Sequence, residues 1–270
     1  FKDYVHDNII KSKNTKLDDH IRISTFNVHL WKNYDGKENY ANIIKTIGEI
    51  DADIIGLQEA LFFSKQSKDI FIKNMMDLGY AHIKICNPTY CINVIASKYP
   101  IKNTKIISLI KDPIKKQSRY CIICEIIIKQ KIITVTCTHL DVYDDTENTR
   151  FEQIKQITSY LNKKENVVLI GDLNSVNPKD YTNEEWGNIV KNDSNRDVET
   201  QTKVTDHLKK CIYIDCFELS KCSRPSVTTW SMRRVDYILF SSKNNFTVNG
   251  CFIVPTLCSD HFPIVAEILI

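Results

Sequence analysis

At 270 residues, 43% of them hydrophobic, the chain is long enough to bury a substantial core and has the composition of an ordinary globular protein. Its formal net charge of +3 is too small to demand or to exclude a polyanionic partner. No apolar run reaches the roughly 18 residues of a transmembrane helix, so no membrane-spanning segment is predicted.

Residues 1–20 are predicted to form a polar arm ahead of a single domain that spans residues 21–270. The arm is charged and lacks the apolar core of a signal peptide, which favours an intracellular protein of the cytoplasm or nucleus. Because the chain begins with Phe1 rather than Met, a leader removed from its N-terminus remains compatible with the sequence.

The periodicity of apolar residues predicts strands interleaved with helices. Residues 21–26 alternate and are β-branched like a strand that ends at Asn27, and residues 40–50 carry isoleucines at helical spacing. Residues 174–211 are polar without a strong β pattern and are predicted as loops with short helices. Further strands are expected at 53–57, 80–85, 91–97, 104–110, 119–128, 131–138, 166–170, 235–240 and 263–270, and further helices at 68–78 and 149–161.

Strands that alternate with helices indicate the α/β class. The strand-rich stretch from 80 to 138 has short connections and therefore requires antiparallel pairing as well. We predict one domain in which two mixed sheets pack together and helices cover them on the outside.

The ten cysteines raise the question of a disulfide framework, but most of them lie inside apolar runs, where cysteine packs as a small hydrophobic residue. Cys121 and Cys124 have the spacing of a redox or zinc pair, but no second Cys or His pair of similar spacing is present to complete a zinc site. We expect them in the core of a protein from a reducing compartment.

Polar side chains mark the points where several predicted strands end or begin. Each one alone has a plain structural explanation, such as a solvated loop acid, turn chemistry or a hydrogen-bonded histidine. At the ends of neighbouring buried strands, however, they predict one assembled polar site. The groups are Phe26-Asn27, Gln58-Glu59, Thr138-His139, Asp172-Leu173-Asn174 and Ser259-Asp260-His261.

The motifs TFNVHLW, DIIGLQEA, THLD, GDLNSV, TTWSMRRVDYIL and SDHFPI occur in this order across nearly the whole chain. In this order and at these spacings, the chain resembles the endonuclease/exonuclease/phosphatase superfamily, which has the DNase I-like fold. The resemblance implies a four-layer α/β sandwich and an enzyme that hydrolyses phosphoesters with Mg²⁺, for which Mn²⁺ is a substitute.

The resemblance also implies a metal site. Glu59 matches the principal Mg²⁺ ligand, Asn27 lies beside it, and Asp260 either contributes to the metal site or orients His261. One carboxylate ligand with few further protein ligands suits Mg²⁺, because this ion prefers oxygen ligands and keeps several of its waters.

The other strand-end residues match catalytic positions of the superfamily. Asp172 corresponds to the acid that positions or deprotonates the attacking water, and Asn174 to the amide that holds a phosphate oxygen. His139 matches a phosphate-contacting imidazole, and Asp236 with His261 resembles the pair in which histidine assists the transition state. Such a set fits the chemistry, because an anionic phosphodiester resists attack until its charge is neutralised and the nucleophile is oriented.

Three further residues are expected to contact the substrate. Asn93 fits a substrate-side asparagine of the superfamily, and Arg119 and Arg234 lie beside predicted strand ends, where a guanidinium group can bind a phosphate. The expected substrate is a nucleic acid, as for a nuclease or a tyrosyl-DNA phosphodiesterase-like enzyme, and the protein is expected to be a monomer.

Two residues disfavour an abasic-site endonuclease: His29 stands where those enzymes carry an acid, and they lack a histidine that matches His139. A phospholipid, sphingomyelin or inositol-phosphate phosphoesterase stays open as the alternative. The Lys-rich segment 110–117 counts against it, because the segment is poor in the aromatic residues of an interfacial loop. A scaffold without catalysis is disfavoured because all the candidate catalytic residues are present.

Overall fold

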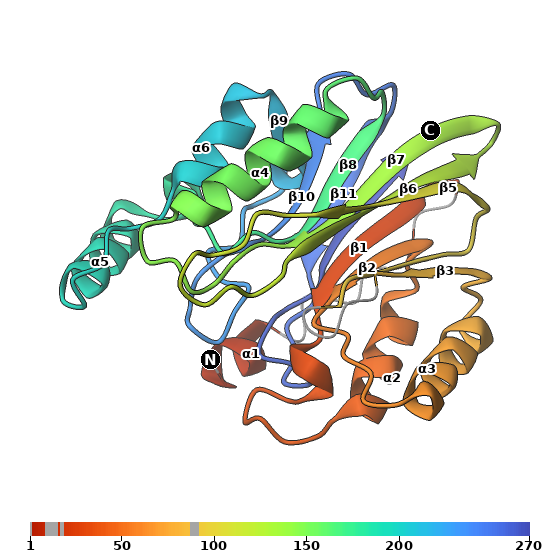
Figure 1. The fold of residues 1–270 in the computed structure, drawn as a ribbon, viewed down its shortest axis with the longest axis horizontal. Helices are drawn as coiled ribbons and strands as arrows, with labels where there is room; N and C mark the ends of the chain where they lie inside the picture. The colour runs from red at the N-terminus through yellow and green to blue at the C-terminus, as the bar shows by residue number, and fades with distance from the viewer. Residues whose placement is uncertain (1, 9–15, 17–18, 87–91) are drawn as a thin grey trace.

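A computed structural model describes residues 2–8, 16, 19–86 and 92–270, and in it two six-stranded sheets pack face to face with helices on both outer faces (Figure 1). This four-layer α/β sandwich confirms the predicted architecture. No helix in the described part of the chain is long and apolar enough to cross a membrane.

The first sheet has the strand order β11-β12-β1-β2-β4-β3. Its centre is mixed, because β1 runs parallel to β2 and antiparallel to β12. All seven residues of β1 are buried, which explains its hydrophobic and β-branched sequence. The strands are β1 (Ile21–Asn27), β2 (Ile54–Gln58), β3 (His82–Ile85), β4 (Val94–Ser97), β11 (Thr247–Ile253) and β12 (Ile264–Leu269).

The second sheet has the order β5-β6-β7-β8-β10-β9 and repeats the same plan. Its central strand β8 runs parallel to β7 and antiparallel to β10. The strands are β5 (Ile101–Ser108), β6 (Tyr120–Ile128), β7 (Lys131–His139), β8 (Val167–Asp172), β9 (Tyr213–Asp215) and β10 (Asp236–Ser241).

Three buried hydrophobic clusters join the four layers. Ile23 and Ile170 belong to the cluster between the sheets, Ile47 and Phe71 join the first sheet to α2 and α3, and Ile157 joins the second sheet to α4 and α6. Figure 1 shows these helix pairs on opposite sides of the sandwich. The helices are α1 (Lys2–Asn8), α2 (Tyr40–Ile50), α3 (Lys65–Asp77), α4 (Asn148–Leu161), α5 (Asn183–Ser194), α6 (Lys203–Lys210) and α7 (Cys216–Leu219).

Most predicted elements are present with shifted ends, but several were missed. The N-terminal arm contains α1, whose Val5 is buried in a small cluster with Val227 and Phe262. The stretch 174–211 contains the 12-residue α5, which was expected to be loop or short helix. Strand β11 was not predicted because its alternation is interrupted by a register shift between Val248 and Gly250. Of the predicted strand at 91–97, residue 91 lies outside the described residues.

The described cysteines include both free and disulfide-bonded residues. Cys121 and Cys124 are free and buried, as packing residues of the core. Cys216 and Cys251 form a disulfide between α7 and β11, which was not predicted. Disulfides are rare in reducing compartments, so this pair does not support the expected intracellular location.

The directions of the strands gather the polar strand ends at one edge of the sandwich. The carboxyl ends of the parallel strands β1 and β2 meet there, as do those of β7 and β8, and the antiparallel neighbours β10 and β12 begin there. Gly171 permits the close approach of β8 to β7. Its φ is +140°, and a Cβ atom at this position would lie 1.9 Å from the carbonyl oxygen of Thr138.

Candidate active site

Three candidate residues form one row across the second sheet. His139, at the end of β7, is paired in register with Asp172 at the end of β8, and Asp172 is paired with Asp236 at the start of β10. Side chains that are paired across neighbouring strands point to the same face, so these three project together from the sheet edge. All three are buried, with at most 4% of each residue exposed.

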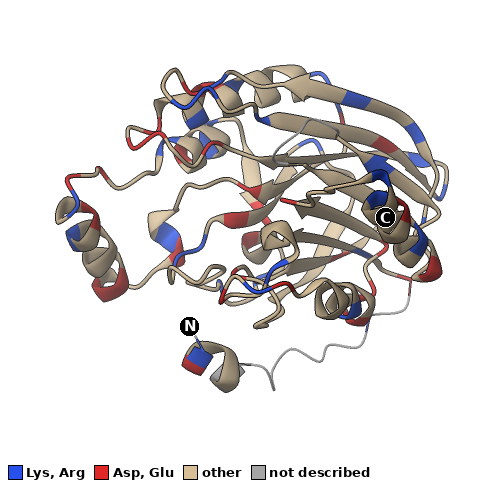
Figure 2. Ribbon diagram, turned by 60° about the horizontal axis from the view of Figure 1, so that its bottom comes forward, with Lys and Arg blue, Asp and Glu red and all other residues tan. Residues whose placement is uncertain are grey.

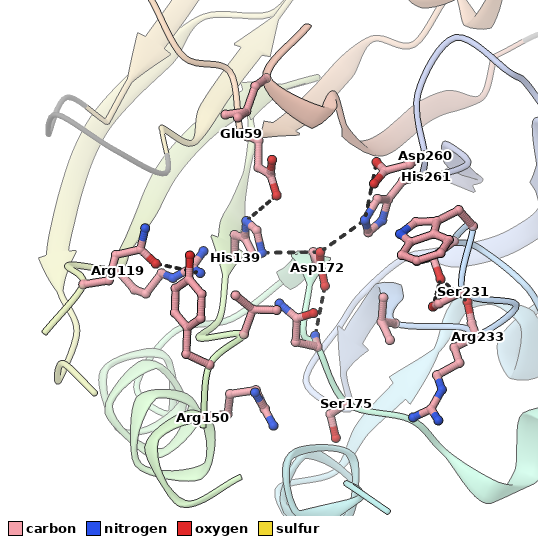
Figure 3. A pocket seen from close by; sticks show the side chains of 18 of the residues that line it. Glu59, Arg119, His139, Arg150, Asp172, Ser175, Ser231, Arg233, Asp260 and His261 are labelled. Carbon is pink, nitrogen blue, oxygen red and sulfur yellow. Dashed lines mark hydrogen bonds and ion pairs between the residues drawn. The ribbon is translucent and has the colours of Figure 1, made fainter. Parts of the chain in front are cut away.

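The first sheet adds Asn27 and Glu59 to this row. Asn27, at the end of β1, donates from Nδ2 to Oε1 of Glu59 at 3.2 Å and to Oδ2 of Asp172 at 3.1 Å, so it bridges the two sheets. The imidazole of His139 lies between the same two carboxylates, with Nδ1 3.7 Å from Glu59 Oε1 and Nε2 3.4 Å from Asp172 Oδ2 (Figure 3).

His261 completes the cluster just before β12. Its Nδ1 lies 2.9 Å from Oδ2 of Asp236, whereas its Nε2 lies 3.8 Å from Oδ2 of Asp172 and 4.0 Å from Oδ1 of Asp260. The hydroxyl of Ser259 donates to the carbonyl of Asn27 at 2.8 Å, which ties this segment to the end of β1. Asp236 is therefore the near partner of His261, and the Nε2 face of the imidazole is turned toward Asp172.

Burial and charge give these groups different protonation behaviour. Burial, followed by the charge of Asp236, raises the pKa of Asp172 to about 7. Burial alone would lower the pKa of His261, but the neighbouring carboxylates, Asp236 first, raise it to about 10. Burial and the charges of Arg119 and His261 hold the pKa of His139 well below its usual range. At neutral pH the site thus combines a protonated imidazole, a neutral imidazole and a carboxyl group that can exchange a proton.

A pocket of about 690 Å³ opens over the cluster, which is within the usual range for small-molecule sites. Figure 2 shows acidic residues near the centre of the molecule and charged residues of both signs spread around them. The wall contains the candidates Glu59, Arg119, His139, Asp172, Asn174, Asp260 and His261, and the cationic residues Lys32, Arg150 and Arg233.

Four predicted residues are not part of the pocket wall. Asn27 and Asp236 belong to the cluster beneath it through their hydrogen bonds to Asp172 and His261, whereas Asn93 and Arg234 lie outside that cluster. Asn93 is fully buried and donates from Nδ2 to the carbonyl of Tyr120 at 2.8 Å. The structure also corrects the expectation for Arg234, because its guanidinium is fully buried between Asp180, at 2.9 Å, and Asp215, at 2.6 Å. Arg234 therefore belongs to an internal ion-pair network, and it is the preceding residue, Arg233, that faces the pocket.

Some residues of the wall were not singled out from the sequence. Arg150 lies on α4, where an arginine on an amphipathic helix gives no local signal of a site. Trp230 falls within the motif TTWSMRRVDYIL, and its exposure was the property that could not be read from the motif. Tyr143 follows His139 by four residues in the β7–α4 loop.

Two groups of side chains offer ligands to a cation. The donor atoms of Asp172, Asp236 and His261 lie within 4.8 Å of one another. A protonated His261 has no free lone pair, however, and its Nδ1 is already paired with Asp236, so this group fits a cation poorly. Glu59 is the better candidate ligand for a cation, because its carboxylate lies in the pocket wall and its side chain is 23% exposed. Asn27 orients this carboxylate through Nδ2, while its Oδ1 accepts the backbone N–H of His29 at 3.0 Å.

Solved structures with the same fold span enzymes of differing description. A structure described as endonuclease/exonuclease/phosphatase from Beutenbergia cavernae DSM 12333 matches with a TM-score of 0.71 at 16% identity, over 93% of this chain and 71% of that one. D. rerio TDP2 complexed with single strand DNA product gives 0.64 at 15% identity, over 93% and 99% of the two chains. A mannosyl-6-phosphatase from Bacteroides thetaiotaomicron VPI-5482 gives 0.63 at 14%, over 93% and 100%. Likeness at these identities shows the fold alone.

A comparison with curated proteins finds no match. The family model of the Endonuclease/Exonuclease/phosphatase family, by contrast, matches residues 24–261, a span that includes every candidate residue from Asn27 to His261. The family match and the shared sandwich fold agree with each other and with the order of the motifs. The chain therefore belongs to the endonuclease/exonuclease/phosphatase family, whose members are phosphoesterase hydrolases.

Proposed function

We propose that the protein is a Mg²⁺-dependent phosphodiesterase that acts on nucleic acid, with Mn²⁺ as a substitute ion. The observation that carries the proposal is the contact chain from Glu59 through Asn27 and Asp172 to His261. Its three atom-to-atom contacts are 3.2, 3.1 and 3.8 Å, so the groups at both ends can reach one phosphate.

In this proposal Glu59 holds the ion, Asn27 orients Glu59, and Asp260, which also lies in the pocket wall, supplies a second carboxylate. A bound divalent ion would neutralise phosphate charge and polarise the phosphoryl oxygen. Oxygen donors of this kind suit Mg²⁺ and leave room for its waters.

Asp172 is the proposed acceptor of the proton from the attacking water. A pKa near 7 lets it take up a proton at neutral pH, and Asn174 fixes its orientation by donating a backbone N–H to Oδ1 at 2.9 Å. His261, held by Asp236, stays protonated and donates toward the charge that develops on the phosphate. Neutral His139 is left to donate a hydrogen bond to a phosphate oxygen.

Nucleic acid is the proposed substrate because several cations surround the acidic centre. Arg119 and Lys32 line the pocket, as does Arg233, which is also paired with Asp193, and these cations match the negative charge of a phosphodiester chain. Among structures of the same fold, TDP2 was solved with a single strand DNA product, which supports this choice without extending it to the present chain.

The test is hydrolysis of bis-p-nitrophenyl phosphate, single-stranded DNA, duplex DNA, RNA, a 5′-tyrosyl oligonucleotide and an inositol phosphate, with and without Mg²⁺. Asp172→Asn and His261→Gln should each lower kcat about 10²- to 10⁴-fold. Glu59→Gln should also abolish Mn²⁺ binding in a calorimetric titration. Glu49→Gln is the matched control, because the Glu49 side chain is 65% exposed on α2. Equal rates for the wild type and all site variants would reject the proposal.

One observation supports a lipid phosphoester as a second candidate. In the Lys-rich segment 110–117, Ile110 is 46% exposed and Ile114 is 83% exposed, as in loops that enter a membrane interface. This exposure weakens the sequence argument against such a substrate. Co-sedimentation with vesicles of phosphatidylserine, compared between the wild type and Ile114→Asp, tests it. Binding that depends on Ile114, with sphingomyelin or inositol-lipid turnover, would favour the second candidate.

A further inference from the structure

Three exposed aromatic side chains lie in the wall of the same pocket. Phe63 is 80% exposed, Trp230 is 61% exposed and Tyr143 is 47% exposed. Large aromatic residues bury much of their surface in most folded proteins, and exposed apolar groups that share one pocket mark a binding surface. We call these three residues the aromatic rim.

Each residue of the rim lies on a loop that also positions a candidate catalytic group. Phe63 follows Glu59 by four residues, and Tyr143 follows His139 by four. Trp230 donates its backbone N–H to the carbonyl of Asp260 at 2.7 Å. The rim therefore surrounds the reacting centre from three separate loops.

The backbone beneath the rim is held in place. The backbone N–H of Tyr143 donates to Oδ1 of Asp141 at 2.8 Å, and Asp141 is fully buried. Near Phe63, the indole of Trp31 donates to the carbonyl of Leu61 at 2.7 Å. Aromatic surfaces presented on fixed loops favour a flat ligand that stacks on them, because little ordering is needed on binding.

The same pocket contains a buried cation that has no carboxylate partner in the described part of the chain. Arg119 is 2% exposed, yet its Nε and Nη1 have no hydrogen-bond partner among the described residues, and Nη2 reaches Gln117 only at 3.3 Å. By contrast, the buried Arg22 and Arg234 each pair with a carboxylate at 2.6 Å, Arg22 with Glu267 and Arg234 with Asp215. A buried guanidinium without a counter-charge is costly unless an anion is bound, so Arg119 predicts an anionic group in the ligand.

We propose that the pocket binds unpaired nucleotides of a single strand, with a phosphate on Arg119 and the bases stacked on residues of the aromatic rim. This inference rests on the proposed phosphodiesterase function and narrows its substrate. A nucleotide offers a π-face and a phosphate together, whereas a sugar or inositol phosphate has no π-face that can stack on an aromatic ring. In a duplex the faces of the bases are already covered by their neighbours, so single strands are preferred. Stacking is tolerant of sequence, so little base preference is expected.

Binding can be measured without catalysis by titrating the protein in EDTA with a fluorescein-labelled oligo-dT and with an abasic oligonucleotide of the same length. The two probes carry the same phosphates and differ in their bases. Wild type should bind oligo-dT more tightly than the abasic strand, and duplex DNA of that length more weakly than oligo-dT. Trp230→Leu, Tyr143→Leu and Phe63→Leu should each weaken oligo-dT binding, in the range of roughly 5- to 100-fold for one stacked base, and change abasic binding less than about 2-fold.

Two further variants separate stacking from charge and from general effects. Arg119→Gln should weaken binding of both strands by the same factor, because both carry the phosphate. Tyr160→Leu should change neither, since Tyr160 is a 37% exposed residue of α4 outside the pocket wall. Thermal unfolding of each variant confirms that it is folded.

Equal affinity of wild type for the oligo-dT and abasic strands would overturn the inference, as would rim variants that weaken both strands alike. Failure of the rim is distinguishable from failure of the proposed function. Metal-dependent hydrolysis of bis-p-nitrophenyl phosphate with no base-dependent binding would reject only the inference that bases stack on the aromatic rim. Base-dependent binding without hydrolysis of any phosphodiester supports the rim and rejects the proposed function.

Discussion

The Arg234→Met substitution leaves two buried carboxylates without the cation that they share. Asp180 and Asp215 lie 2.9 and 2.6 Å from the guanidinium, and their side chains are 0% and 6% exposed. Removal of one partner from a buried ion pair costs about 3–5 kcal/mol. Asp180 keeps Arg224 at 3.2 Å, so we expect a loss of about 4 kcal/mol rather than the full cost for two orphaned charges.

Urea unfolding at pH 8 measures this loss. With a slope of about 3 kcal/mol/M, the midpoint should fall by more than about 1 M. Burial raises the pKa of Asp180, whereas the charge of Arg234 lowers it. Removing that charge should therefore raise the pKa of Asp180 further. A carboxyl group with a raised folded-state pKa loses stability as the pH rises, so the deficit should be smaller at pH 5 than at pH 8.

Arg233→Met is the comparison variant, because the neighbouring Arg233 lines the pocket and its side chain is 21% exposed. Arg233 pairs with Asp193, whose side chain is 2% exposed and which keeps Arg196 as a partner, so this substitution should lower stability by less than Arg234→Met and should raise KM for a phosphodiester. A stability loss below about 1 kcal/mol for Arg234→Met, together with a raised KM, would refute the reasoning and restore Arg234 as a substrate contact.

Three further predictions concern stability. Hydrogen bonds ahead of α4 lower the pKa of Asp144 to about 2, although burial opposes the shift. The stability that this ionised carboxylate contributes is present above its unfolded-state pKa of 3.8 and is lost as the pH falls toward 2. Asp144→Asn should therefore lower the free energy of unfolding by about 1 kcal/mol at pH 7 and by almost nothing at pH 2, as measured by urea unfolding at both pH values. Replacing Cys216 and Cys251 with serine should cost about 3–4 kcal/mol more under oxidising conditions than in excess reductant, for a sequence separation of 35. In reductant only the burial of two hydroxyl groups in the core remains, and an equal loss under both conditions would contradict the disulfide. Gly171→Ala should cost more than about 2 kcal/mol in thermal unfolding and lower kcat, because the added Cβ meets the carbonyl of Thr138; wild-type behaviour would show that the close approach is not required.

Much of the site could be predicted because its signals are local. A strand buried on both faces is a short apolar run, and a polar residue at its end interrupts that run visibly in the sequence. Asn27, Glu59, His139 and Asp172 were found in this way, and the structure brings them into contact. Their chemical roles stay predictions.

Properties that depend on neighbours distant in the chain could not be read in the same way. Arg233 and Arg234 are adjacent and chemically identical, yet successive side chains of an extended segment point to opposite sides. One faces the pocket and the other is sealed between Asp180 and Asp215. Nothing within the motif distinguishes the two, because the distinction depends on carboxylates that lie 54 and 19 positions from Arg234 along the chain.

The sequence by itself determined the α/β class, the family motifs and the polar residues at the ends of the strands, since each follows from local patterning. Tertiary structure decided which of these residues share a pocket, that Arg233 rather than Arg234 lines it, and that Trp230 is exposed at the rim. The physical reason is strand register and burial: pairing places Asp236 beside Asp172, and both exposure and pKa depend on groups that only the folded chain brings together.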